Sequence, residues 1–161
     1  MAEFLCTADP KRLSPDVYTD LLITYLIKFE RYQLLEVLQL KCGEEEHMSV
    51  TVSCHDILHF DASLGFSIIY YPKLLLPLFE EAAVGAQEKL KKIDSKSTNN
   101  IRTLRTKRNC HIRVTLLPPL KQLCKDTIGE IRSSDSETLI QIAGTVVRTG
   151  SVRLLELSKE V

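Results

Sequence analysis

Five cationic side chains in the second half of the chain are candidate phosphate ligands. Two of them, Arg148 and Arg153, flank the cluster Thr149-Gly150-Ser151, whose composition is that of a tight turn. Arginine and lysine combine positive charge with several N–H donors, which suits them to nucleic-acid backbones. A DNA-binding surface is therefore one interpretation of these residues, and ordinary exposed strand charges are the other. The full set is Arg148, Arg153, Arg113, Lys107 and Arg108.

The distribution of charge supports a polyanionic partner. The formal net charge is zero, yet residues 1–90 carry seven basic against fourteen acidic side chains, and residues 91–161 carry the reverse. Between Lys89 and Lys125 there are eleven basic residues and one acid, Asp94. Such a block is typical of a segment that meets nucleic acid, although a solvated basic linker has the same composition. No aromatic residue lies beyond residue 100, so base-stacking platforms are absent from this half.

A cysteine- and histidine-rich stretch raises metal binding as a second chemistry. His55 and His59 would share one face of a helix, as zinc ligands sometimes do. There is no CxxC pair, so we expect no metal site and favour core packing for Cys54 with exposed histidines. The stretch contains Cys42, His47, Cys54, His55 and His59.

The remaining reactive groups give no support for catalysis. Cys110 precedes His111, but adjacent side chains in a strand point to opposite faces and cannot form a dyad. A phosphate-binding GxxxxGK[ST] loop does not occur in the sequence. The five cysteines are odd in number and lack paired spacing, which indicates reduced thiols in a cytosolic or nuclear protein.

The elements that position these groups begin with a helical half. Ser14-Pro15-Asp16 has the features of a helix start, and apolar residues recur at helical spacing from there to about Leu40. A short β-branched run at residues 49–52 predicts a brief strand. Further helices are expected over 54–60, from a cap at Asp61 through 69, and from Pro72 or Pro77 to a linker at 94–100.

Beyond the linker the period changes to that of strands. Residues 111–116 alternate polar and apolar, and Pro118-Pro119 ends that segment. Residues 120–131 are expected to form a short helix. The pattern over residues 139–157 predicts a strand, a turn and a second strand, and Gly144 lies within the first of these two strands.

Several of these segments together resemble the N-terminal region of minichromosome maintenance (MCM) helicases. The sequence GTVVRT at 144–149 is the most specific match, and its pairing with RLLEL at 153–157 is most similar to the recombination-associated paralogue, the ninth member. The other matching segments are 61–64, 71–72 and 78–83 in a helical signature, 111–114 in a first barrel strand, and Leu-Pro-Pro at 117–119.

The resemblance implies an α+β fold, in which an N-terminal helical bundle precedes an incomplete OB-type β-barrel. The expected domains are the bundle at 1–94, a basic linker at 95–107 and the first barrel strands at 108–161. The family's zinc-binding insertion and ATPase domain are expected to follow Val161. We therefore expect no cofactor in this chain, whereas the full-length family uses ATP, Mg and Zn.

The resemblance also implies a function. The expected role is the N-terminal DNA-binding and ring-assembly region of a nuclear MCM-type helicase, acting in DNA replication or recombination repair. Its partners would be DNA, expected to be single-stranded, and other MCM subunits, without a membrane. The alternative is a stand-alone protein-interaction module, whose unfinished strand pair is completed by a partner strand.

Overall fold

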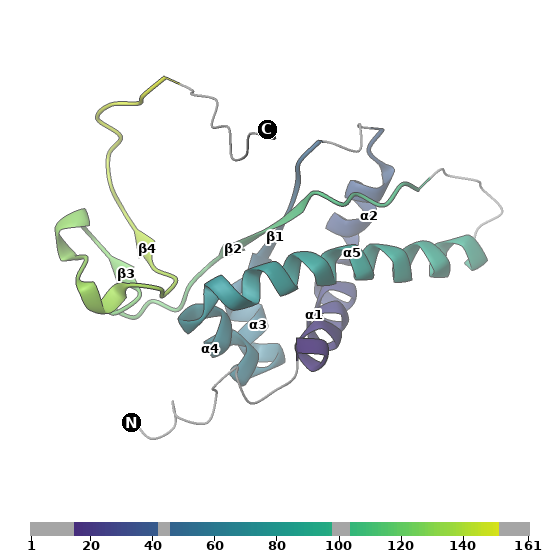
Figure 1. Cartoon of the computed structure of the whole chain (residues 1–161), viewed down its shortest axis with the longest axis horizontal. Helices are drawn as coiled ribbons and strands as arrows, with labels where there is room; N and C mark the ends of the chain where they lie inside the picture. The colour runs from purple at the N-terminus through teal and green to yellow at the C-terminus, as the bar shows by residue number, and fades with distance from the viewer. Residues whose placement is uncertain (1–14, 42–45, 98–103, 152–161) are drawn as a thin grey trace, which may run out of the picture.

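The computed structural model describes residues 15–41, 46–97 and 104–151, which form α-helices and two small parallel sheets (Figure 1). Among these residues no helix is both long and apolar enough to cross a membrane. The helices are α1 (Pro15–Phe29), α2 (Arg31–Gln39), α3 (Cys54–Phe60), α4 (Ala62–Tyr70) and α5 (Pro72–Ser97). The strands are β1 (Met48–Ser53), β2 (Cys110–Thr115), β3 (Cys124–Lys125) and β4 (Gln141–Ile142).

Helix α5 is the centre of the fold. It runs across the molecule in Figure 1 and packs against α1, α2, α4 and β2. Leu75, Phe79, Ala83 and Ala86 recur at helical spacing along it, and all four are buried in one continuous core. These residues form the inner face of α5. The helix begins at Pro72, so Pro77 lies inside it, and it continues to Ser97 through part of the expected linker.

The expectation of one helix from Pro15 to about Leu40 is wrong in detail. Glu30, with φ −109° and ψ 20°, separates α1 from α2. This bend orients α2 so that Gln33 reaches β1. There the Gln33 side chain accepts a hydrogen bond from the Thr51 N–H at 3.0 Å and donates one to the Thr51 carbonyl at 2.9 Å. A tertiary contact therefore overrides a continuous helical pattern.

The two short helices, α3 and α4, each begin at a capping side chain. Ser53 Oγ accepts from the Asp56 N–H at 3.2 Å at the start of α3, and Asp61 Oδ1 accepts from the Leu64 N–H at 2.8 Å at the start of α4. Each bond satisfies a donor that the first helical turn leaves without a partner. The helices expected over 54–60 and after Asp61 are confirmed.

The brief strand expected at 49–52 and the strand expected at 111–116 both form, and they pair with each other. β1 and β2 are parallel, with Val50 opposite Ile112 and Val52 opposite Val114. Val50 and Val52 are fully buried against the helices. The segment expected to open a barrel therefore pairs with β1 in the sheet that covers the helical core.

The chain after β2 differs most from expectation. The short helix expected over 120–131 is wrong, because this stretch contains β3 and a single turn of 3-10 helix at Ile128–Glu130. β3 pairs in parallel with β4, and the Leu139 N–H donates to the Ile69 carbonyl at 2.8 Å. Leu123 and Ile69 then bury a small second cluster beside α4. This β3–β4 unit lies at one end of the helical part (Figure 1).

The expected strand pair over 139–157 is only partly observed. β4 covers Gln141–Ile142, while residues 143–151 have no regular secondary structure. The second strand, at 153–157, lies outside the described residues. The two sheets do not close into a barrel within the described part of the chain. What is established is a mixed arrangement of helices and small sheets.

Candidate nucleic-acid interface

The extended segment 104–110 carries candidate DNA-binding cations on a supported backbone. Its buried side chains recur at every third position: Leu104, Lys107 and Cys110. Arg105 and Arg108, each one position later, are exposed. A three-residue period is that of an extended, polyproline II-like chain, in which every third side chain lies on the same face. The segment therefore directs one face into the core and a row of arginines toward solvent.

Gln87 of α5 holds this segment in place. Its side-chain Oε1 accepts from the Lys107 N–H at 2.9 Å, and its Nε2 donates to the Lys107 carbonyl at 3.2 Å. The Arg105 N–H donates to the Leu38 carbonyl at the end of α2 at 3.3 Å. Because Gln87 is fully buried, these bonds have no competition from water. The exposed arginines thus project from a backbone that two helices hold.

Lys107 is not one of these solvent-facing cations. Its side chain is 2% exposed, and it occupies the central inward position of the three-residue repeat. A phosphate cannot reach a side chain buried to this degree without local opening of the chain. The spacing of Leu104, Lys107 and Cys110 also identifies Arg105, which is absent from the set expected from sequence, as an outward-facing cation. This three-residue repeat is the feature of the sequence that could have distinguished the buried Lys107 from the exposed Arg105.

Arg113 continues the cationic row in β2. It is exposed, and it lies opposite Thr51 of β1 while its neighbours Ile112 and Val114 are half-buried against the core. This is the polar-face position expected from the alternation. The structure therefore gathers Arg105, Arg108 and Arg113 on one continuous segment.

The two arginines expected around the turn are not brought into this row. Arg148 is exposed, in the irregular segment 143–151 that follows β4. Arg153 lies outside the described residues, as does the far side of the expected turn. Arg148 therefore belongs to a separate part of the molecule from Arg113, and the rigid strand support expected for it is not observed.

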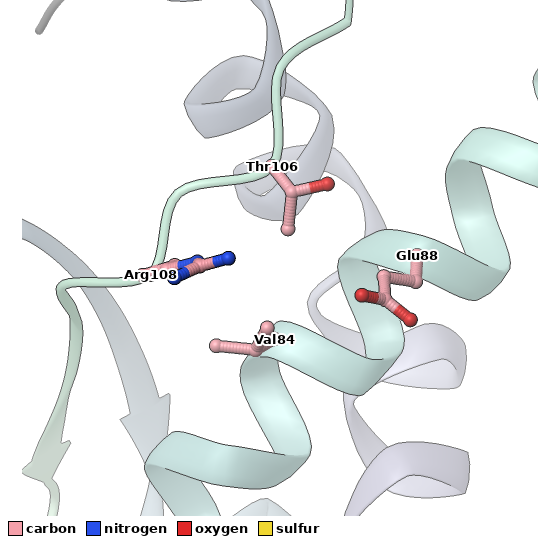
Figure 2. Close-up of a pocket in the computed structure, with 4 residues that line it drawn as sticks. All are labelled: Val84, Glu88, Thr106 and Arg108. Carbon is pink, nitrogen blue, oxygen red and sulfur yellow. The ribbon is translucent and has the colours of Figure 1, made fainter. Parts of the chain in front are cut away.

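A shallow pocket of about 220 Å³ lies between α5 and the cationic segment. Figure 2 shows its lining, with the Arg108 guanidinium and the Glu88 carboxylate on opposite sides and Val84 and Thr106 between them. The volume is below the roughly 300–1,000 Å³ of typical small-molecule sites. The Glu88 carboxylate also places negative charge in the lining of the pocket, which would oppose an anionic small molecule inside it. The pocket is thus an unpromising small-molecule site.

The cysteine and histidine groups are arranged differently from a four-ligand metal centre. Within the described ranges, no three potential ligand side chains gather around a common point. Cys54 and Cys110 are buried, and burial raises the pKa of each thiol to about 11. Cys110 faces the core while His111 faces outward to Glu80, with Nδ1 and Oε1 3.0 Å apart. The alternation argument against a cysteine–histidine dyad therefore agrees with the geometry.

Comparison with known proteins agrees with this fold. The family model described as "MCM9, N-terminal domain" matches residues 15–118, which include both the helices and β2. Two curated relatives from rice, each named "Probable DNA helicase MCM9", are 28% identical over 149 residues (Oryza sativa subsp. indica) and 26% identical over 145 residues (Oryza sativa subsp. japonica). Each alignment covers 88% of this chain, which spans only 22% of each relative's length.

The fold is also similar to the crystal structure of the N-terminal domain of an archaeal MCM. The TM-score is 0.53 at 18% sequence identity, and the match covers 81% of this chain and 46% of the archaeal chain. At this identity the likeness shows a shared fold and nothing about shared ligands.

Proposed function

The chain belongs to the MCM9 N-terminal domain family, and from this premise we propose that it is the DNA-binding and ring-assembly region of an MCM-type DNA helicase. In this proposal the helicase acts in the nucleus, in DNA replication or recombination repair. The region binds single-stranded DNA and packs against other MCM subunits in a ring. It has no membrane partner.

The observation that carries the proposal is the row of exposed arginines on residues 104–113. Arg105, Arg108 and Arg113 project from a backbone that is hydrogen-bonded to Gln87 and paired with β1. Cations on a supported backbone lose little freedom on binding, so more of the phosphate attraction contributes to affinity. Arg148 adds a cation from the segment after β4.

The proposal includes an OB-type barrel built around residues 108–161. Support comes from the apolar side chains that the segment after β3 leaves in solvent, among them Val146 at 77% and Val147 at 94% exposure. Strands packed over these residues would bury them, and a closed sheet would remove the exposed edges. The strands that complete the barrel are not among the described residues.

Cofactors are assigned to the longer helicase in this proposal. The residues present do not fit the family's zinc group, since the sequence has no CxxC pair. ATP and Mg would be used by an ATPase domain, and this chain contains no phosphate-binding loop. DNA binding by residues 1–161 accordingly requires no added cofactor.

A salt titration of DNA binding tests the proposal. Fluorescence anisotropy of a labelled oligothymidylate is measured over a range of NaCl concentrations, for the unchanged chain and for the triple variant Arg105→Ala, Arg108→Ala, Arg113→Ala. Affinity should fall in the variant, and the log–log salt slope should become shallower by about 0.7 for each phosphate that the three arginines neutralise. The double variant Arg148→Ala, Arg153→Ala reports the contribution of the later arginines in the same assay.

A charge-matched control separates specific placement from net charge. Lys41→Ala, Lys73→Ala and Lys121→Ala together remove three exposed cations from other parts of the surface. This control should retain most of the affinity. Equal losses of affinity in the two triple variants would mean that only overall charge matters, and salt-independent binding by the unchanged chain would contradict the proposal.

The second candidate function is a stand-alone protein-interaction module. The exposure of Val146 and Val147 favours it, because apolar side chains on an irregular segment can be covered by a strand from another protein. Size-exclusion chromatography with candidate MCM subunits distinguishes the two functions. A stable protein complex combined with no salt-sensitive DNA binding would favour the module.

A further inference from the structure

The four histidines of the chain stand in two ring-to-ring pairs. His47, before β1, pairs with His111 in β2, and His55 pairs with His59 one turn later in α3. The shortest nitrogen–nitrogen separations are 2.7 Å in the first pair and 3.2 Å in the second. The relative orientation of the rings differs between the two pairs, and it fits a hydrogen bond in the first pair and metal chelation in the second.

The His47–His111 pair has the geometry of a hydrogen bond. The ring planes are inclined by only 11°, and the centroids are 5.0 Å apart. That separation is as large as a 2.7 Å contact allows for two five-membered rings, so the rings lie end to end. The other nitrogen of His111 contacts Glu80 Oε1 at 3.0 Å. A proton between the two rings and another toward Glu80 satisfy this chain of contacts without a metal ion.

The His55–His59 pair has a different geometry. Its ring planes are inclined by 69°, and the centroids are only 4.4 Å apart although the Nε2 atoms are 3.2 Å apart. The two nitrogens therefore do not meet head-on. Nitrogens about 2.0–2.1 Å from a tetrahedral zinc ion are about 3.3–3.4 Å from each other, so the observed spacing is close to that of two ligands on one ion.

Helix α3 holds the two rings in this relation. Residues four apart lie on the same face of an α-helix, one turn above the other. Both histidines are exposed, His55 with 68% of its side chain accessible, so an ion can reach them directly. Asp56 Oδ1 lies 3.8 Å from Nδ1 of His55, the nitrogen that does not face His59. At this distance the carboxylate acts on the imidazole through its charge and makes no hydrogen bond to it, and it lies on the side where metal-binding histidines commonly have a carboxylate.

We propose that His55 and His59 chelate one divalent transition-metal ion through their Nε2 atoms, with water completing the coordination. The bound ion belongs to the class of metal ions that prefer imidazole nitrogen as a ligand, which includes Zn²⁺, Ni²⁺ and Cu²⁺. The ion would join the two ends of one turn of α3. Because the site is formed only when the turn is helical, ion binding stabilises the folded chain.

Isothermal titration with NiCl₂ on the tag-free chain 1–161 tests the site. Cys6 and Cys42 are replaced by serine in every sample, so that their thiols do not compete for the ion. We expect saturable binding of one Ni²⁺ per chain and a rise in melting temperature. His55→Ala or His59→Ala should weaken binding by more than roughly tenfold, and Asp56→Asn by a smaller factor.

The other histidine pair supplies the matched control. His47→Ala and His111→Ala each remove one imidazole from the hydrogen-bonded pair and should leave Ni²⁺ affinity unchanged. In NMR spectra, paramagnetic broadening by Ni²⁺ should centre on the amides of α3. Broadening centred on His111, unchanged affinity in His59→Ala, or no saturable binding would each overturn the proposal.

Discussion

The helical core and the segment after β2 follow similar sequence patterns and reach different outcomes. In the core, apolar residues at helical or strand spacing are buried, as Phe79 and Val50 illustrate. After β2, residues with equally strong β-forming character, Val146 and Val147, lie in solvent. Periodicity therefore predicts which face of a segment is apolar, but that face is buried only where another part of the fold packs against it. The helices provide that surface for β1 and β2. Nothing in the described part of the chain provides it for residues 143–151.

The largest expected effect comes from emptying the core. Phe79→Ala removes a fully buried ring that packs edge-on against Tyr25, with ring centroids 6.1 Å apart. We expect a loss of about 3–5 kcal/mol in the free energy of unfolding, because the cavity relaxes only in part. Urea denaturation followed by circular dichroism measures it.

Val147→Ser is the matched substitution in the exposed region. It should change the free energy of unfolding by no more than roughly 0.5 kcal/mol, since the side chain already lies in water. If Val147→Ser lowered the free energy of unfolding as much as Phe79→Ala, the two regions would not differ in packing. Residues 143–151 would then pack on the core in solution.

A smaller effect should follow from cutting the hydrogen bonds that join residues 104–110 to the core. Gln87→Ala removes the side chain that bonds to both the N–H and the carbonyl of Lys107. We expect a cost of about 1–3 kcal/mol, because these buried backbone groups lose a partner that water cannot easily replace. Hydrogen exchange at the Lys107 amide should accelerate along with this loss of stability.

Gln33→Ala offers a paired test of the same motif at an exposed position. Gln33 makes the equivalent two bonds to Thr51, but water can replace them there, so about 0.5–1.5 kcal/mol is expected. Equal exchange rates at the Lys107 amide in Gln87→Ala and in the unchanged chain would show that the inward packing of Leu104 and Cys110 alone holds the segment.

The smallest effect concerns acid sensitivity of the β3–β4 unit. The Arg132 backbone N–H, followed by Lys125, holds the pKa of Asp135 below its ordinary value of 3.8. The carboxylate therefore contributes stability that is present above about pH 4 and is lost as the pH falls through the lower folded-state pKa. Hydrogen exchange at the Gln141 amide should accelerate in that range, while amides of α5 remain protected.

Asp135→Asn provides the control for this acid response. In this variant, hydrogen exchange at the Gln141 amide should no longer show the acceleration caused by protonation of Asp135, since residue 135 then has no carboxylate. If α5 and β4 lost protection together as the pH fell, the two regions would form one cooperative unit, and the contrast between them would not extend to acid stability.

Local sequence features predicted most of the helical half. The caps at Ser53 and Asp61 and the apolar face of α5 depend on neighbours a few residues away, so they could be recognised in the sequence. The pairing of β1 with β2 could not, because it joins residues about sixty positions apart. The break at Glu30 was also missed, since it reflects a contact between Gln33 and a distant strand.

The sequence identified most of the cations of the candidate interface, but it did not predict that one of them is buried or how their backbone is held. Arg108 and Arg113 are exposed as expected, while Lys107 is buried because an extended chain with a three-residue period turns it inward. Alternation at period two, which describes strands such as β2, does not describe residues 104–110. Arg148 is exposed as well, but its backbone lacks the strand that its sequence predicts.

The two hydrogen bonds between Gln33 and Thr51 also affect the open edge of the β1–β2 sheet. The N–H and carbonyl of Thr51 face away from β2, on the open side of β1, where they would otherwise template another chain. The Gln33 amide occupies both groups, much as a neighbouring strand would. The Gln33 side chain thereby leaves neither of these Thr51 groups available for strand addition by another molecule.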